Sequence, residues 1–123
     1  MLEVDVLGTA LPEDDVRRLC ALALASAGIE DGHLAVAFVD AERIAALNAE
    51  HRGRAEPTDV LSFPVDGPGE AIGEREIGDV VICPEHTEDL GEAVVHGVLH
   101  LTGMDHESDH GEMLALQREI LSW

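Results

Sequence analysis

The sequence has no lysine and no tyrosine, and its 123 residues include only two phenylalanines, one tryptophan and two cysteines. So few aromatic rings leave little material for the stacking platforms on which many single-strand nucleic-acid binders rely. Cys20 and Cys83 lie in apolar surroundings, and neither belongs to a CxxC pair. We therefore expect two reduced core thiols, although the sequence leaves a disulfide between them open.

Long apolar runs are also missing. No stretch approaches the roughly 18 apolar residues of a membrane span, and the first ten residues, MLEVDVLGTA, lack the basic and apolar regions of a signal peptide. P-loop, GxGxxG and GxSxG motifs are absent as well. We expect a single cytoplasmic domain over residues 1–123, with no membrane partner.

Positive charge is scarce, since seven arginines oppose 26 carboxylates for a formal net charge of −19. Such a surface repels phosphate backbones at long range, and we expect no DNA partner. The simplest explanation is solubility, or adaptation to a salty cytoplasm that screens the repulsion. If the protein acts on RNA, its cationic contacts must be local and few.

Alternation of apolar and polar residues and the positions of glycine and proline predict an α/β fold. A small mixed sheet packs with helices in one domain, and residues 66–74, rich in glycine, form a loop. Asp40 is placed to cap the second helix, and Pro64 to stop the third strand. The expected strands are 2–7, 33–39, 59–63 and 77–83, and the expected helices are 12–27, 41–53, 88–102 and 108–121.

The segment HGVLHLTGMDH carries three histidines with the spacing of a metal site. His96 and His100 are four residues apart, so on a helix they lie about 40° apart on one side, one turn from each other. Gly103 can end that helix in a left-handed conformation, which lets the chain bring His106 to the same point. Three histidines with a fourth position open are typical of a catalytic zinc ion. We predict one Zn²⁺ at this site.

Zinc peptidases of the metzincin type place histidines and glycine in the same register, HExxHxxGxxH. Here Gly97 occupies the position of the glutamate that serves those enzymes as general base. The sequence thus predicts a zincin-like metal helix without the peptidase base. A zinc metallopeptidase-like hydrolase stays open as an alternative.

Other polar residues are candidates for a supporting role. Arg52 and Arg54 flank Gly53, and a guanidinium can hold a phosphate through two hydrogen bonds. A metal-bound histidine usually donates its second N–H to a carboxylate or a carbonyl. The nearby acids that we consider for this are Asp59, Asp79 and Asp105. The remaining histidines lack a partner at ligand spacing, and we expect them to be structural or at the surface: His33, His51, His86 and His110.

The same histidine segment resembles the signature of the YbeY family of bacterial metal-dependent endoribonucleases. LNAEHRGRAEPTDVLSFP (47–64), IGDVVICPE (77–85) and GEMLALQREIL also resemble blocks of that family. Together they cover nearly the whole chain after residue 40. The segment between Pro84 and His96 is shorter than in the family.

The resemblance implies zinc held by His96, His100 and His106, with Arg52 near the metal as a catalytic residue. It further implies cleavage of single-stranded RNA, 16S rRNA 3′-end maturation, ribosome quality control and the small ribosomal subunit as partner. A non-catalytic, zinc-stabilised ribosome-associated factor is a further alternative.

Overall fold

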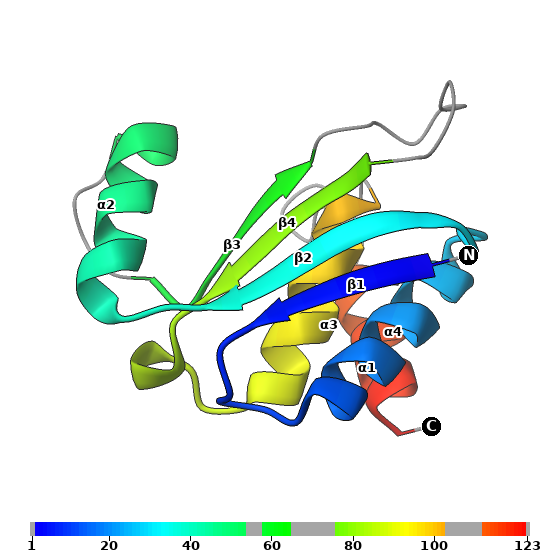
Figure 1. The fold of residues 1–123 in the computed structure, drawn as a ribbon. Coiled ribbons are helices and arrows are strands. Elements are labelled where there is room, and N and C mark those ends of the chain that lie inside the picture. Colours follow the sequence, from blue (N-terminus) through cyan, green and yellow to red (C-terminus); the bar gives the residue numbers. More distant parts are fainter. Residues whose placement is uncertain (1, 54–57, 65–75, 103–111, 123) are drawn as a thin grey trace.

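The computed structural model describes residues 2–53, 58–64, 76–102 and 112–122, and in these residues the elements follow the predicted order (Figure 1). The predicted loop at 66–74 lies outside them. In chain order the elements are β1 (Leu2–Leu7), α1 (Glu13–Ser26), β2 (Gly32–Phe38), α2 (Ala41–Arg52), β3 (Val60–Pro64), β4 (Glu76–Ile82), the short 3₁₀ helix η1 (Pro84–His86), α3 (Leu90–Leu101) and α4 (Glu112–Leu121).

The four strands form one mixed sheet in the order β1-β2-β4-β3. β1, β2 and β4 are parallel to one another, whereas β3 runs antiparallel to β4 along one edge. This arrangement confirms the predicted α/β class with a small mixed sheet. It also places the end of β4, from which the chain continues through η1 into α3, in the interior of the sheet rather than at its edge.

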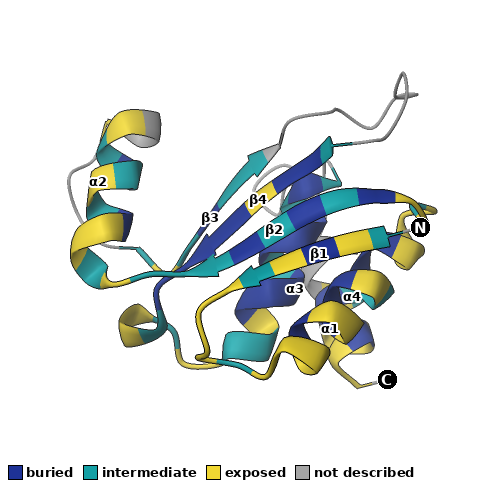
Figure 2. Ribbon diagram, viewed as in Figure 1, coloured by how far each residue is buried: buried dark blue, intermediate teal, exposed yellow. Residues whose placement is uncertain are grey.

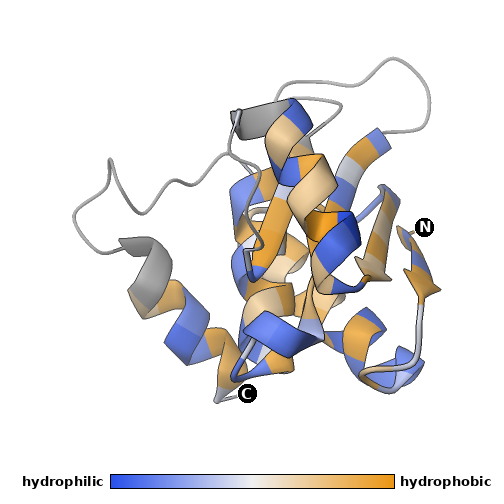
Figure 3. Cartoon of the chain, turned by 90° about the vertical axis from the view of Figure 1, so that its left-hand side faces the viewer, coloured by the Kyte–Doolittle hydropathy of each residue, from blue (hydrophilic) through white to orange (hydrophobic). Residues whose placement is uncertain are grey.

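The helices pack on one face of the sheet and at one of its ends (Figure 1). α1, α3 and α4 lie together on one face, and α2 stands at the far end of the sheet (Figure 1). Most of α3 is buried (Figure 2), because its apolar residues contact α1, α4, β3 and β4. A smaller apolar cluster on the other face joins Ile44 of α2 to Leu61, Val81 and Cys83. α2 itself shows hydrophilic and hydrophobic residues around its axis (Figure 3).

The helix ends follow local capping chemistry. As predicted, Asp40 caps α2, and its carboxylate accepts a hydrogen bond from the Arg43 N–H at 2.8 Å. Gly53 ends that helix in the left-handed conformation, with φ of 70°. The prediction that the histidine helix begins at Glu88 is wrong by two residues. The Asp89 carboxylate accepts from the Glu92 N–H at 3.0 Å, so α3 starts just after this cap.

Two further expectations concern Pro64 and the cysteines. Pro64 is the last residue of β3 rather than the first beyond it, which an edge strand tolerates because it needs no complete hydrogen-bond ladder. Cys20 and Cys83 are buried and free, as expected, and burial raises the pKa of the Cys20 thiol to about 12. Within the described part of the chain, no helix is long and apolar enough to cross a membrane.

Candidate metal centre

α3 carries two of the three predicted zinc ligands on one side. The Nε2 atoms of His96 and His100 are 3.1 Å apart, and the two rings meet edge-on with centroids 4.7 Å apart. Two nitrogens bound to one tetrahedral zinc ion at 2.0–2.1 Å would be separated by about 3.3 Å. The two imidazoles are therefore already close to the spacing of ligands that share a metal ion.

The rest of the predicted site is only partly described. His106 lies outside the described residues, as do Asp105 and Arg54. The backbone of Arg52 ends α2, and nothing is described of its side chain. Among the residues that the structure does describe, no three histidine, cysteine or acidic side chains form a group able to hold a metal ion. The three-histidine set and the position of Arg52 stay predictions.

The neighbouring side of α3, about 80° around the helix from the two imidazoles, is pressed onto the sheet at Gly97. A Cβ atom at this position would lie 2.5 Å from Cγ1 of Val80 and 3.2 Å from Cγ2 of Val60. The Gly97 carbonyl also accepts a hydrogen bond from the Ser62 hydroxyl at 2.9 Å. In this chain the position that holds the general base in zinc peptidases thus has no room for a side chain.

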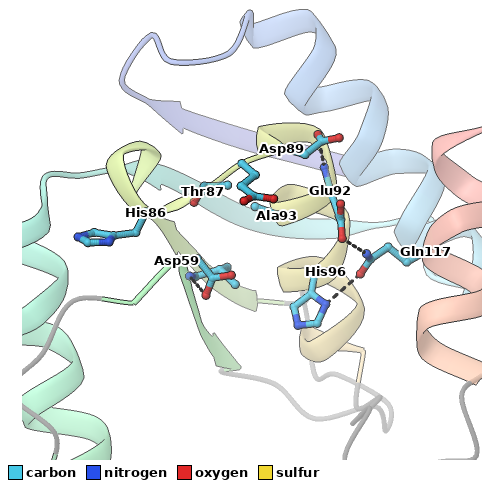
Figure 4. Close-up of a pocket in the computed structure, with 10 residues that line it drawn as sticks. Asp59, His86, Thr87, Asp89, Glu92, Ala93, His96 and Gln117 are labelled. Atoms are coloured by element: carbon cyan, nitrogen blue, oxygen red, sulfur yellow. Dashed lines mark hydrogen bonds between the residues drawn. The ribbon is translucent and has the colours of Figure 1, made fainter.

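A polar pocket opens beside His96, with a volume of about 410 Å³ (Figure 4). Residues from β3, η1, α3 and α4 line it together with the turn that leads into α3. Four of its side chains are carboxylates and two are imidazoles, so its walls suit cations and hydrogen-bond donors better than bare phosphates. The lining residues are Asp59, Val60, His86, Thr87, Glu88, Asp89, Glu92, Ala93, His96 and Gln117.

Of the predicted supporting acids, the structure describes Asp59 and Asp79, and it places them differently relative to His96. Asp59 lines the pocket, and its carboxylate accepts hydrogen bonds from the Val60 N–H and the Thr58 hydroxyl. Asp79 is exposed on β4, where it alternates with Val80, the residue that meets Gly97 under α3. Since successive side chains of a strand point to opposite faces, Asp79 lies on the face away from His96. The hypothesis that Asp79 supports a ligand histidine is therefore wrong.

Among the described residues, His96 also contacts Gln117, which the sequence did not single out. Its Oε1 lies 2.9 Å from His96 Nδ1, and its Nε2 donates to Glu92 Oε1 at 3.0 Å. Glu92 precedes His96 by four residues, so helical spacing signals that they are neighbours. Gln117 is on a different helix, and no local pattern links it to His96.

The other described histidines fit the structural expectation. His33 lies between the carboxylates of Asp5 and Glu76, at 2.7 Å from each. The hydrogen bonds that the His33 ring donates to Asp5 and then to Glu76 raise the pKa of His33 to about 9. His86 is exposed at η1 and borders the pocket.

Comparison with known proteins connects this geometry to a family. The chain matches the family described as Endoribonuclease YbeY over residues 8–123. The chain belongs to the endoribonuclease YbeY family. The family is one of RNA-cleaving hydrolases, which assigns the chain to the endoribonucleases.

Relatives named Endoribonuclease YbeY include the protein of Rubrobacter xylanophilus. It is 44% identical over 121 residues, covering 93% of this chain and 86% of the relative. The Bacillus cytotoxicus protein is 39% identical over 128 residues, covering 86% and 82%. A solution structure of a Thermotoga maritima protein superposes with a TM-score of 0.59 at 26% identity, covering 97% of this chain and 87% of that one.

Proposed function

We propose that this YbeY-family protein is a zinc-dependent endoribonuclease that cleaves single-stranded RNA in the cytoplasm. Its proposed substrate is pre-rRNA, in 16S rRNA 3′-end maturation and ribosome quality control, with the small ribosomal subunit as partner. The observation that carries the metal part is the 3.1 Å approach of the His96 and His100 Nε2 atoms at the border of a polar pocket.

Each part of the chain has a defined task in this proposal. α3 presents His96 and His100 to one Zn²⁺, and His106 supplies the third ligand. The bound ion would supply a Lewis acid and lower the pKa of a water molecule. Ser62 and Gly97 hold the neighbouring side of α3 against the sheet, so the two imidazoles stay in place.

Arg52 is proposed as the catalytic residue that holds the phosphoryl oxygens and stabilises their developing charge. The acidic wall of the pocket explains why the proposed reaction needs this cation. Asp59, Glu88 and Glu92 repel a phosphate that enters along their side. The scissile phosphate therefore needs positive charge from the metal and from Arg52. Asp105 is proposed to orient the attacking group.

The metallopeptidase alternative loses support at Gly97, because the strands under α3 leave no space for a carboxylate there. A casein or peptide-library assay of the zinc-loaded protein checks this directly, and no turnover is expected. Peptide turnover that disappears on chelation would favour the peptidase instead.

The first prediction is that both metal and activity depend on His100. Zinc-loaded wild-type protein should cleave a labelled single-stranded RNA. His100→Ala should lose its zinc, measured by plasma emission spectrometry, and its cleavage, because two remaining histidines hold zinc poorly. Arg52→Ala should keep its zinc but cleave about 10²–10³-fold more slowly.

His86→Ala is the matched control, since it removes an exposed imidazole at the same pocket without touching the proposed ligands. It should keep the zinc content of the wild type. Full zinc retention by folded His100→Ala would contradict the ligand assignment. Equal cleavage by all the proteins would indicate a contaminating nuclease. Full biological activity without metal would favour the non-catalytic factor.

A further inference from the structure

Three side chains form a row that ends on the candidate metal ligand His96. Glu92 Oε1 accepts from Gln117 Nε2 at 3.0 Å, and Gln117 Oε1 lies 2.9 Å from His96 Nδ1 (Figure 4). Glu92 and His96 come from α3, whereas Gln117 reaches them from α4. Gln117 is only 4% exposed, so these contacts, rather than bulk water, decide how its amide is oriented.

The orientation of the Gln117 amide follows from the chemistry of Glu92. An amide can turn by 180° and exchange its donor and acceptor, but a carboxylate only accepts. With the amide reversed, the Gln117 oxygen would face the Glu92 oxygens, acceptor against acceptor. The backbone of Glu92 is fixed at the start of α3, because its N–H donates to the capping carboxylate of Asp89. The Gln117 NH₂ group must therefore face Glu92.

The orientation of the amide in turn selects one tautomer of His96. Since Gln117 Oε1 accepts, His96 Nδ1 must carry the proton. The lone pair is then on Nε2, the atom that lies 3.1 Å from His100 Nε2. A neutral imidazole binds a metal through its unprotonated nitrogen, so this is the tautomer that zinc requires at that position.

We propose that Glu92 and Gln117 are positioning residues that hold His96 in its Nδ1–H tautomer with Nε2 directed at the metal position. The proposal rests on the proposed zinc site, and it adds residues that act through a ligand without touching the metal. Glu92 determines the orientation of Gln117, and Gln117 determines the tautomer and the ring orientation of His96.

The tautomer can be measured without any metal. Long-range ¹H–¹⁵N NMR correlation of the metal-free full chain, at about pH 8 so that ordinary histidines are neutral, tells a protonated ring nitrogen from a bare one. In the wild type, we expect His96 to show a single form with Nδ1 protonated. A single Nε2-protonated form would overturn the proposal.

Three variants separate the two positioning residues. Gln117→Leu removes the acceptor at similar volume, and Glu92→Gln replaces a pure acceptor by an amide that can also donate. In both, a population of Nε2-protonated His96 should appear. The double variant Glu92→Gln/Gln117→Glu exchanges the two side chains and restores the row, because the amide at 92 donates to the carboxylate at 117. It should return His96 to the wild-type tautomer even if Gln117→Leu fails to fold.

Zinc affinity provides the second measurement, by competition with a coloured chelator. Glu92→Gln and Gln117→Leu should weaken binding about 10-fold or more, and the exchanged pair should recover most of the loss. Glu88→Gln is the matched control. It removes the same charge from the same pocket outside the row, and it should bind zinc as the wild type does.

The possible failures are distinguishable. If the wild type binds no zinc, the proposed function loses its metal, while the tautomer measurement still decides whether the row orients His96. If zinc binds but Glu92→Gln and Gln117→Leu match the wild type in tautomer and in affinity, the positioning roles are wrong. Equal weakening by Glu88→Gln would also contradict them, since pocket charge alone would then explain the effect.

Discussion

Gly97 shows how one missing side chain decides both the packing and the chemistry of α3. In the sequence it lies between His96 and His100 of the predicted metal site. In the structure it is buried on the side of the helix that faces β3 and β4. The helix can approach the strands this closely only because residue 97 has no Cβ atom. The same closeness brings the Gly97 carbonyl within reach of the Ser62 hydroxyl. Here the residue that replaces a peptidase's base is a packing residue.

Replacing Gly97 by alanine should therefore destabilise the protein. The new Cβ would meet the buried, β-branched Val80 at 2.5 Å, a distance that forces the helix or the strand to move. Alanine's better helix propensity offsets only about 1 kcal/mol of this strain. We expect a net loss of about 1–2 kcal/mol in the free energy of unfolding, measured by urea denaturation.

Gly91→Ala provides the control on the same helix. Its Cβ would lie 3.4 Å from Asp89 and 3.5 Å from Leu19, which are ordinary contacts. This variant should be neutral or stabilised by up to about 1 kcal/mol. Equal stability of the two alanine variants would show that Gly97 is not needed for the close packing.

At the scale of elements, His33 links three strands. It stands on β2 between Asp5 of β1 and Glu76 of β4, with one ring nitrogen at 2.7 Å from each carboxylate. Only the protonated ring has two N–H groups, so both bonds together require the charged form. The raised pKa of about 9 expresses this preference. The cluster therefore stabilises the parallel part of the sheet as long as His33 is protonated.

The stability of the sheet should depend on pH in a direction set by His33. Its pKa is near 6.5 in an unfolded chain and about 9 in the folded one, so its contribution is complete below about pH 6.5. It is lost as the pH rises through about 9. Because the side chains of Asp5 and Glu76 are 69% and 47% exposed, solvent screening limits the effect to about 1 kcal/mol.

Urea denaturation of the wild type and His33→Gln at pH 6, 7.5 and 9 measures this difference. The gap in unfolding free energy between the two proteins should be largest at the lowest of these values and should close at the highest. His86→Gln, which changes an exposed histidine outside the sheet, should show no such trend. A gap that widens towards alkaline pH would contradict the role given to His33.

For the molecule as a whole, the net charge of −19 acts against the proposed substrate. Most nucleic-acid-binding surfaces attract phosphates through arginine and lysine, and their affinity falls as salt is added. Here the long-range field has the opposite sign, and the chain offers only seven arginines as cationic side chains. Added salt shortens the range of the repulsion to about 10 Å at 0.1 M. Encounter with free RNA should therefore improve with salt.

We expect kcat/KM for cleavage of a single-stranded RNA to rise several-fold between about 50 and 300 mM potassium chloride. The gain should come mainly from KM, because screening acts on encounter rather than on the chemical step. A matched series in sucrose, which adds no ions, should leave kcat/KM nearly unchanged. A steep fall with salt would indicate a dominant positive contact surface and would contradict the expectation.

Most of the fold could be predicted from the sequence, because its signals are local. Alternation in 2–7 and the capping position of Asp40 depend on neighbouring residues, and the structure confirms both. The spacing of His96 and His100 is likewise a local property of a helix, and their approach to 3.1 Å follows from it. Two predicted element boundaries were wrong. α3 begins after the Asp89 cap rather than at Glu88, and β3 includes Pro64 rather than ending before it.

The sequence by itself determined the order of elements, the pair of histidines on one side of α3 and membership of the family. Only the tertiary structure decided what surrounds that pair. Asp79 lies on the face of the sheet away from α3, because strand pairing sets which side chains face α3. Gln117 lies beside His96 because α4 packs on α3. This packing brings together two residues that are 21 positions apart in the sequence. Such contacts depend on how elements pack, and no period of 2 or 3.6 residues records them.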